Sequence, residues 1–214
     1  MQSPRSTVVC FAVKEEARFF NPAPGSNGRI QTLVTGMGAR NAENGIRTLL
    51  ATEHPELVLS CGFAGGLLPG LQTGSIVFGV DPETNLHSSL LANGAIPARF
   101  HCAQHVATTA EQKRALRQST GADAVEMESG IICNACRSHK IPSGTIRVIL
   151  DTADENLPLD FNKLMTKDQQ MDYGKLAMSL VKSPWKILAL LRLQKQGSSA
   201  AQRLATVLNE VLLS

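Results

Sequence analysis

The sequence predicts a single α/β domain with a largely buried central sheet, and three observations support this prediction. Short apolar segments of strand length alternate with segments of helical pattern along the 214 residues. Turn residues separate these segments. Hydrophobic residues make up 43% of the chain and charged residues 18%, which is enough apolar material for a core. Strands that alternate with helices are typical of α/β proteins.

The expected elements follow from these patterns in chain order. Strands are expected in apolar, β-branched or alternating runs at residues 7–13, 29–35, 57–61, 75–80, 99–108, 122–127 and 145–150. Helices are expected at residues 14–20, 41–53, 110–118 and 128–140, and again from about residue 160 onward. Turns or glycine-bearing loops are expected at residues 21–28, 36–40 and 62–66.

Composition and charge narrow the class of function. The net charge is +3, and Lys and Arg are scattered along a chain with one Trp and one Tyr. Nucleic-acid binding usually needs a basic cluster and often stacking aromatics, so no nucleic-acid partner is expected. The first residues lack a full signal-peptide core and cleavage site, so a cytoplasmic protein is expected.

The five cysteines are expected to be free thiols, because an odd number in a cytoplasmic chain argues against a disulfide framework. Cys133 and Cys136 form a CxxC pattern, but they fall within a helical segment, and no second cysteine pair is present. His139 is the one metal-ligand type nearby. We therefore expect buried helical cysteines rather than a zinc or redox site, with no metal and no cofactor.

Ligands of α/β folds bind at the carboxyl ends of strands. Four segments occupy such positions here, at residues 14–18, 62–66, 126–128 and 151–154. The glycine segment 62–66 would let backbone N–H groups approach a ligand closely, although a plain tight turn is equally compatible with it. It matches neither a dinucleotide-binding fingerprint nor a phosphate-binding loop of the Walker type.

Acidic residues occur in the other three segments. Glu126 and Glu128 flank Met127 between a strand and a helix, where they could interact with the helix dipole or could bind sugar hydroxyls over an apolar Met. Asp151 ends an apolar strand, where it could be an N-cap, but Asp154 is the better candidate for that role. Glu16 follows the first strand, where an acid would ordinarily be solvated.

Five motifs, in the same order, resemble the nucleoside phosphorylase and nucleosidase superfamily between residues 8 and 161. They are AVKEEARFF, GMGARNAENGI, CGFAGGLLPGLQTGSIV, AVEMES and RVILDTAD. Within this superfamily the motifs are similar to those of the 5′-methylthioadenosine/S-adenosylhomocysteine nucleosidases. Residues 120–129 and the tail at 173–196 are closer to the hopanoid-associated, nucleosidase-like branch, which releases adenine from a lipid-linked adenosine.

The resemblance implies a three-layer αβα domain with a central mixed sheet. Residues 1–165 would form the nucleoside phosphorylase-like domain, and residues 166–214 a helical C-terminal extension packed on the same domain. It also implies a homo-oligomer, a dimer or higher.

The resemblance further implies an enzyme that cleaves the N-ribosyl bond of a purine nucleoside, of adenosine type and modified at the 5′ position. Asp151 would be the general acid at the base, and Glu16 would orient or deprotonate water. Glu128 would bind the ribose hydroxyls and stabilise positive charge on the sugar, against which Met127 would pack. The remaining implied substrate-binding residues are Glu126, Phe63, Ala64, Gly65, Val106 and Ala107. Phe63 stands where the nucleosidases usually have Ser.

Water or inorganic phosphate would be the co-substrate. Arg18 and Arg40 are the candidate phosphate ligands, so phosphorolysis is the main alternative to hydrolysis. The second alternative is a catalytically degenerate member that binds a nucleoside or lipid without turnover. The presence of Glu16, Glu128 and Asp151 together argues against this alternative.

The C-terminal tail is apolar around most of the helical circumference at residues 176–181 and 185–193, with Lys and Arg interspersed. Pro184 separates the two segments and is expected to start the second helix. A helix this apolar must be buried, pair with a partner or lie on a membrane. Burial against the domain or a dimer partner is the simpler interpretation. The alternative hypothesis is peripheral contact with an anionic membrane, with Trp185 at the interface.

Overall fold

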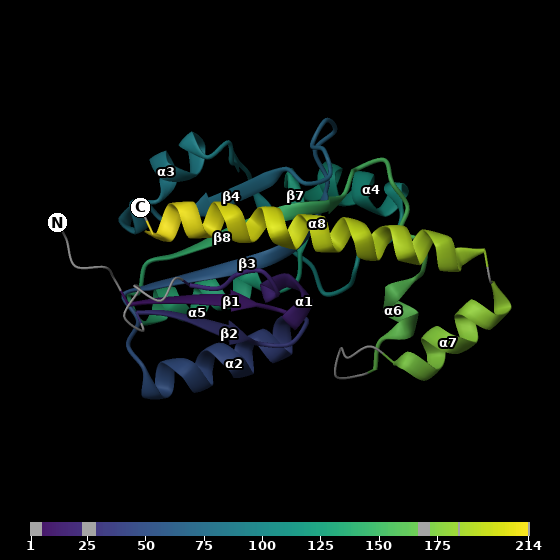
Figure 1. Cartoon of the computed structure of the whole chain (residues 1–214). Coiled ribbons are helices and arrows are strands. Elements are labelled where there is room, and N and C mark those ends of the chain that lie inside the picture. Colours follow the sequence, from purple (N-terminus) through teal and green to yellow (C-terminus); the bar gives the residue numbers. More distant parts are fainter. Residues whose placement is uncertain (1–5, 23–28, 167–171, 184, 214) are drawn as a thin grey trace.

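The computed structural model describes residues 6–22, 29–166, 172–183 and 185–213, and it has the predicted α/β architecture. A mixed central sheet is covered by helices on both faces, and α8 (Lys186–Leu213) runs along the whole length of one face (Figure 1). The predicted fold class is thereby confirmed.

The elements follow the predicted order. The strands are β1 (Thr7–Phe11), β2 (Ile30–Val34), β3 (Leu57–Gly66), β4 (Ile76–Val80), β5 (Ile96–Pro97), β6 (Phe100–Cys102), β7 (Ala124–Glu126) and β8 (Ser143–Asp151). The other helices are α1 (Lys14–Ala17), α2 (Ala39–Thr52), the 3-10 helix η2 (Pro82–Thr84), α3 (His87–Ala92), α4 (Ala110–Thr120), α5 (Ser129–Ser138), α6 (Phe161–Leu164) and α7 (Tyr173–Lys182).

The sheet has the strand order β2-β1-β3-β8-β4-β5, with β7 paired to the end of β3 and β6 paired to β7. β2, β1, β3 and β8 are all parallel, so their carboxyl ends lie at one edge of the sheet. β4 is antiparallel to β8, and β7 is antiparallel to β3. The parallel strands place three of the four candidate segments, 14–18, 62–66 and 151–154, at this edge, and β7 brings the fourth, 126–128, to it by pairing with the end of β3.

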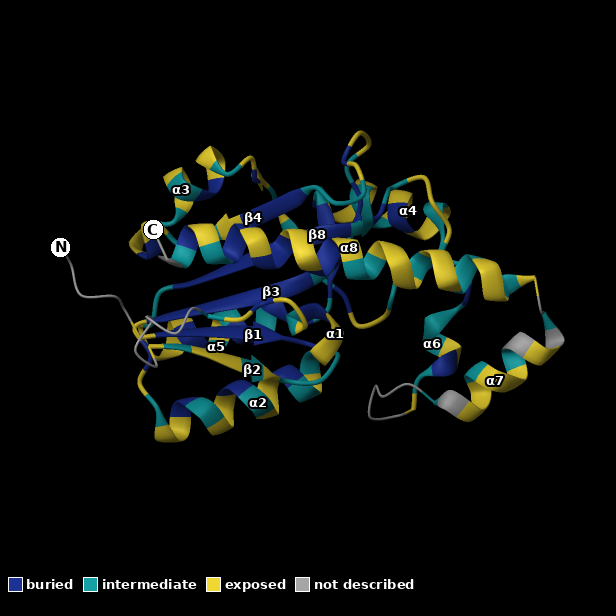
Figure 2. Ribbon diagram, viewed as in Figure 1, coloured by how far each residue is buried: buried dark blue, intermediate teal, exposed yellow. Residues whose placement is uncertain are grey.

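Successive side chains of a strand point to opposite faces of the sheet, so each strand contributes to the apolar clusters on both faces. Val9 and Phe11 of β1 lie in the cluster that contains the C-terminal half of α8, whereas Val8 and Cys10 face the cluster formed by α2 and α5. The strands β1, β3, β7 and β8 are buried almost throughout, whereas β2 and β5 are largely exposed (Figure 2). Strands buried on both faces are expected of a parallel sheet, since helices cover both sides.

Helix α8 divides into two parts by burial. Ala201, Leu204 and Leu208 are fully buried against the sheet, so the C-terminal half belongs to the main core. The N-terminal half is exposed or only partly buried (Figure 2). The division of the chain at residue 165 stays a prediction. Pro184 lies outside the described residues, and the second tail helix begins at Lys186.

Three local expectations are wrong. Residues 62–66 are not a loop or tight turn, because β3 continues through them by pairing with β8 and then with β7. The strand expected at 99–108 is limited to β6. Asp154 caps no helix, because the chain turns there and the next helix, α6, begins at Phe161 with Asp160 at its N-cap.

Cys133 and Cys136 lie on α5 as free thiols; Cys136 is buried and Cys133 partly buried. Among the described residues, no group of three or more His, Cys, Asp or Glu is arranged to hold a metal ion. A search of the same residues found no helix long and apolar enough to cross a membrane.

Candidate active site

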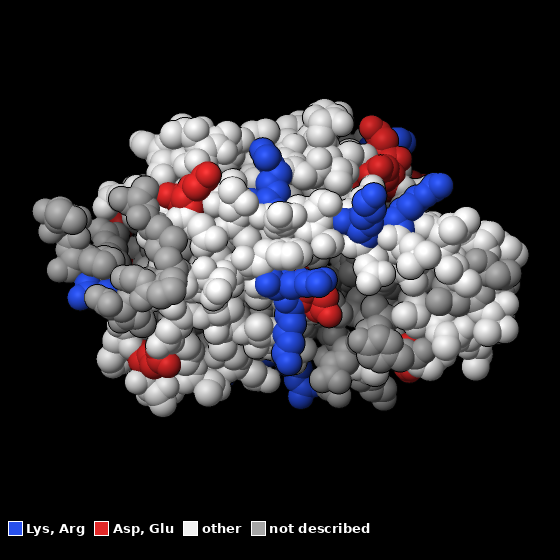
Figure 3. Space-filling view, viewed as in Figure 1, with Lys and Arg blue, Asp and Glu red and all other residues white. Residues whose placement is uncertain are grey.

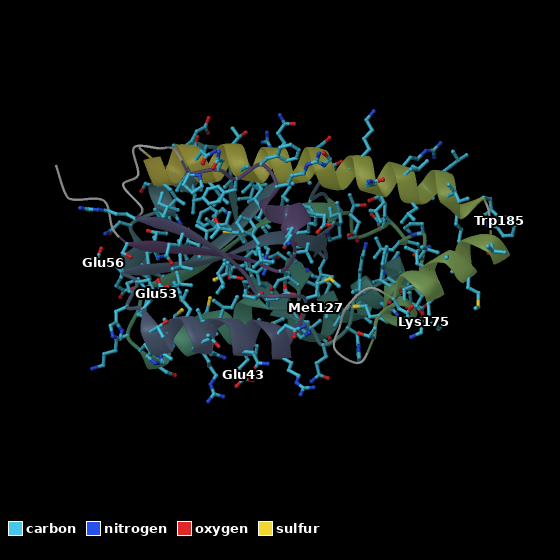
Figure 4. The ribbon with its side chains drawn as sticks, turned by 60° about the horizontal axis from the view of Figure 1, so that its bottom comes forward. Glu43, Glu53, Glu56, Met127, Lys175 and Trp185 are labelled. Atoms are coloured by element: carbon cyan, nitrogen blue, oxygen red, sulfur yellow. The ribbon has the colours of Figure 1, made fainter. Side chains whose placement is uncertain are left out.

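The carboxyl ends of the parallel strands enclose a cavity of about 300 Å³. Every substrate-binding or catalytic residue predicted from the sequence lines it: Glu16, Phe63, Ala64, Gly65, Val106, Ala107, Glu126, Met127, Glu128 and Asp151. Four segments distant in the sequence therefore meet at one place, as the strand-end rule predicts. Figure 4 shows Met127 between the sheet and the arm formed by α7 and the start of α8.

Glu16 is a buried carboxylate held by backbone donors. One oxygen accepts N–H groups of Ala12 (2.9 Å) and Val13 (3.2 Å), and the other accepts the N–H of Phe63 at 2.8 Å. Burial raises the pKa of Glu16 from 4.5 to about 7, although Arg147 and these hydrogen bonds act in the opposite direction. A carboxyl group with a pKa near neutrality is suited to general-base catalysis.

Gly62 is the residue that allows this arrangement. Its φ is +146°, a conformation that side chains rarely adopt. A Cβ atom there would lie 2.5 Å from Oε1 of Glu16 and 2.6 Å from Nη1 of Arg147. The first glycine of the segment thus makes room for buried charged groups, which differs from the predicted approach of backbone to ligand.

Glu128 lies at the start of α5 and contacts the loop that follows β2. Its Oε1 accepts the N–H of Gly38 at 2.8 Å, and its Oε2 lies 3.5 Å from Nη2 of Arg147. Burial raises the pKa of the Glu128 carboxyl, and Arg147 opposes the shift. A second acid is therefore fixed in the wall of the cavity.

Glu126 also lines the cavity, but both of its carboxylate oxygens accept hydrogen bonds from other residues of the protein. Its Oε2 accepts the N–H groups of Glu128 and Ser129 at 2.9 and 2.7 Å and a 2.7 Å hydrogen bond from Arg147. Its Oε1 accepts the Ser129 hydroxyl at 2.7 Å. These contacts satisfy the first turn of α5, so Glu126 orients the site rather than offering oxygens to a substrate.

Arg147 connects the acids, and the sequence analysis missed it. It is 1% exposed in the middle of β8, and its Nη2 also donates to the Ser60 hydroxyl at 3.0 Å. The surrounding carboxylates raise the pKa of Arg147 above its ordinary value. An Arg in the otherwise apolar strand 145–150 was the available signal, because a charge in a buried strand must be paired.

Asp151 ends β8 and forms a buried ion pair with Lys113 of α4. Burial raises the pKa of Asp151, while Lys113 lowers it in part. The Lys113 ammonium also donates to the carbonyls of Thr152 (2.6 Å) and Glu155 (2.8 Å), which fixes the chain after β8. Lys113 is fully buried, whereas the charged pattern of its helix predicts solvent exposure. The contact with Asp151 is therefore not predictable from this pattern.

Phe63 points its ring toward α8, where it lies near Gly197. Phe63 therefore brings an apolar ring and no hydroxyl to the cavity, at the position where the resemblance implies a Ser. Lys113 supplies a polar partner for Asp151 from α4 instead.

Val106 and Ala107 form a wall of the cavity in the segment before α4. The backbone N–H and C=O of Val106 are both paired with the side-chain amide of Asn162, each at 2.9 Å. Leu157 donates its N–H to Thr108 at 2.9 Å. These contacts join the wall to the segment that leads into α6.

The remaining lining is mostly apolar and was not predicted. It is formed by Ala12, Val13, Met37, His105, Val125, Leu150, Leu157, Phe161 and Leu193. No Lys or Arg is among the described residues that line this cavity. Arg18 and Arg40, the candidate phosphate ligands, are exposed and lie outside the lining.

Sequence comparisons find similar proteins of one superfamily. The family model of the phosphorylase superfamily matches residues 98–182. A 5′-methylthioadenosine/S-adenosylhomocysteine nucleosidase of Actinobacillus succinogenes is 29% identical, over 65% of this chain and 75% of the relative. A nucleosidase of the same name from an Exiguobacterium species is 24% identical, over 73% of this chain and 81% of the relative.

Solved structures share the fold. Futalosine hydrolase of Helicobacter pylori superposes with a TM-score of 0.69 at 16% identity, covering 97% of each chain. A 5′-methylthioadenosine/S-adenosylhomocysteine nucleosidase of Streptococcus pneumoniae gives a TM-score of 0.68 at 14% identity, over 96% of this chain and 97% of that one.

The comparisons therefore agree with the resemblance to the nucleoside phosphorylase and nucleosidase superfamily that the motifs predict, and the relatives found are enzymes. Within it, the relatives described above are nucleosidases. The closer resemblance to the hopanoid-associated branch stays a prediction.

Proposed function

We propose that this chain hydrolyses the N-ribosyl bond of a purine nucleoside of adenosine type and releases the free base. The observation that carries the proposal is the convergence of Glu16, Glu128 and Asp151 from separate strand ends on one largely apolar cavity. N-ribosyl cleavage needs an acid at the base, a group that stabilises a cationic sugar and a means of activating water.

Asp151 is the proposed general acid. As the bond between C1′ and the purine nitrogen breaks, its electron pair passes to the base, and a proton at purine N7 makes the base a better leaving group. The upward pKa shift that burial causes at Asp151 favours a carboxyl that can hold this proton. Lys113 holds the carboxyl in place and is a positioning residue in this scheme.

Glu128 and Glu16 act on the sugar side. Glu128 accepts ribose hydroxyls and stabilises the positive charge that develops at C1′, with Met127 packed against the ring. Glu16 orients a water molecule, and its carboxylate accepts a proton when the water oxygen bonds to C1′. The products are the purine base and the free sugar, so all atoms of water and nucleoside are accounted for.

Water is favoured over phosphate by the charge of the cavity. A bound phosphate dianion would need cationic ligands, whereas Arg18 and Arg40 lie elsewhere and the buried Arg147 is paired with Glu126 and Glu128. A further anion beside the carboxylates of Glu16 and Glu128 would be repelled. Phosphorolysis is therefore the less favoured alternative.

The apolar part of the lining supports a substrate with an apolar 5′ group. Leu150, Leu157, Phe161 and Leu193 form this part, and a nucleoside with a free 5′ hydroxyl would leave it unfilled. The curated relatives are named for substrates modified at this position. The homo-oligomer and the cytoplasmic location stay predictions.

The test is incubation of the full chain with adenosine, inosine and 5′-alkylthio adenosines, with and without inorganic phosphate. We expect adenine and free sugar at the same rate under both conditions, fastest with the alkylthio substrates. Formation of a sugar 1-phosphate would establish phosphorolysis instead. If the chain binds nucleoside but releases no base, it is a catalytically degenerate member that binds without turnover.

A further inference from the structure

Apolar side chains gather on the outside of the arm that α7 and α8 form. Among the described residues, every large apolar side chain more than half exposed lies there: Met178, Val181, Trp185, Leu188 and Leu191, at 55–82%. Ile187 is also exposed, at 43%. In Figure 4, Trp185 projects from the outer end of the arm, away from the body of the molecule. A concentration of exposed apolar side chains in one part of a molecule usually marks an interaction site.

Basic residues predominate along the arm, although Asp172, just before α7, forms an ion pair with Lys175 at 3.5 Å. Between residues 173 and 209 the sequence contains six Lys or Arg and no Asp or Glu. Leu188, Arg192 and Lys195 follow the spacing of one helical face, so basic residues continue the apolar row along α8. Figure 3 shows Lys and Arg groups over α8 and an almost uncharged described surface toward α7.

A basic hollow adjoins the apolar surface. It has a volume of about 420 Å³ and is lined by Arg192, Lys195 and Arg203 together with the polar side chains of Thr73, Gln196 and Ser199. Among the described residues, no Asp or Glu contributes to this lining. Such a set of donors fits the phosphate of an anionic lipid headgroup.

We propose that the α7–α8 surface, formed by Met178, Val181, Trp185, Ile187, Leu188, Leu191, Arg192 and Lys195, docks on an anionic lipid bilayer. Amphipathic helices that bind in the membrane interface combine buried apolar side chains with Lys and Arg that contact anionic headgroups. Exposed Trp at the boundary of the two is typical of interfacial anchors.

A second copy of this chain is a poorer occupant. A symmetric dimer would place the same surface of each subunit against its partner, so basic side chains would face basic side chains. The net charge of the whole chain is +3, so two copies would also repel each other weakly overall. An anionic bilayer is the partner that complements both the apolar and the basic part.

Docking would place the membrane beside the active-site cavity. Leu193 lines that cavity, whereas Leu191 and Leu188 are exposed on the same helix. Successive residues of a helix are about 100° apart, so one segment of α8 presents one face to the cavity and another to solvent. The inference does not depend on the proposed function, because it concerns binding of the chain to lipid.

The test is co-sedimentation of the full chain with vesicles of phosphatidylcholine alone and with vesicles that also contain phosphatidylglycerol. We expect binding to the anionic vesicles at low salt and its loss at high salt. Arg192→Gln with Lys195→Gln should weaken binding about 30-fold, at about 1 kcal/mol for each basic side chain. The matched control is Arg47→Gln with Arg114→Gln, which removes the same charge from α2 and α4 and should change binding little.

The apolar contribution has its own variants. Leu188→Glu should weaken vesicle binding at least about tenfold, because it places a charge where an apolar side chain enters the interface. Leu91→Glu, at an exposed position on α3, should leave binding intact. Failure of the wild-type chain to sediment with anionic vesicles would overturn the proposal. So would equal binding to both vesicle types, or a dimer that Leu188→Glu dissociates without any vesicle binding.

Discussion

Replacing Glu16 by Gln tests the proposed base and the environment that sets its pKa. Burial raises the pKa of this carboxyl from 4.5 to about 7. The folded protein therefore keeps a proton that the unfolded chain loses between these two values. Each pKa unit is worth about 1.36 kcal/mol, so the shift corresponds to about 3 kcal/mol of unfolding free energy.

The sign of the stability change follows from the direction of the shift. The contribution of Glu16 to stability is fully present below pH 4.5 and is lost as the pH rises to about 7. The pKa values of Glu128 and Asp151 are also raised, so their contributions to stability decrease with rising pH in the same way. Glu16→Gln should remove about 3 kcal/mol of the total decrease across this window.

Activity should depend on pH in the opposite direction. The water-activating form of Glu16 is the carboxylate, so kcat/KM should rise with a midpoint at about pH 7. In Glu16→Gln the rise should disappear and kcat/KM should fall about 10²–10⁴-fold, the usual contribution of a general base. A Gln also presents one acceptor oxygen to three backbone N–H donors, so lower stability at every pH is expected.

Two assays follow both effects: urea unfolding between pH 4.5 and pH 8, and base release over the same range. Glu15→Gln is the matched control, because Glu15 is the exposed neighbour on α1 and should alter neither profile. An unchanged midpoint in the kcat/KM profile of Glu16→Gln would show that another group is responsible. An unchanged slope of stability against pH would refute the raised pKa.

Three further variants test the surrounding contacts. Asp151→Asn should reduce base release about 10²–10⁴-fold, because an amide is not a proton donor of adequate acidity, whereas Asp154→Asn on the exposed turn should retain activity. Gly62→Ala should lower both activity and Tm, because the added Cβ would lie 2.5 Å from the buried Glu16 carboxylate of α1. Gly74 also has a positive φ, but a Cβ added there would have no atom within 4 Å. Gly74→Ala should therefore lower Tm without changing activity. Lys113→Met should destabilise the fold by about 3 kcal/mol in urea unfolding, because it leaves a buried carboxyl without its partner. Base release should then shift to a different pH range, and an unchanged pH profile would exclude a positioning role.

The strand ends could be predicted because local patterns determine them. Apolar and β-branched runs predict β1, β3, β7 and β8, and the rule that ligands bind at the carboxyl ends of strands then selects the segments that contain Glu16, Glu128 and Asp151. The sequence resemblance assigned a chemical role to each acid. The structure brings these residues to one cavity, and their roles remain to be measured.

The missed features depend on packing between distant segments. Lys113 belongs to a helix whose pattern predicts solvent exposure, and only the fold shows that it turns toward Asp151. The three glycines at 62–66 predict a loop, because glycine is common in turns, but in the structure Gly62 continues strand β3 beside Glu16. Asp154 fits the composition of an N-cap, yet α6 begins seven residues later. The residue types alone cannot distinguish a buried Lys from an exposed one, a Gly in a strand from one in a loop, or an Asp in a turn from one at an N-cap.

The central claim is that water cleaves the N-ribosyl bond at this cavity. The most direct measurement is base release from a 5′-alkylthio adenosine in water labelled with heavy oxygen, followed by mass spectrometry of the sugar. Hydrolysis at this cavity predicts free purine and a sugar that carries one labelled oxygen at C1′, at a rate that inorganic phosphate does not change. An unlabelled sugar 1-phosphate, formed only when phosphate is present, would contradict it.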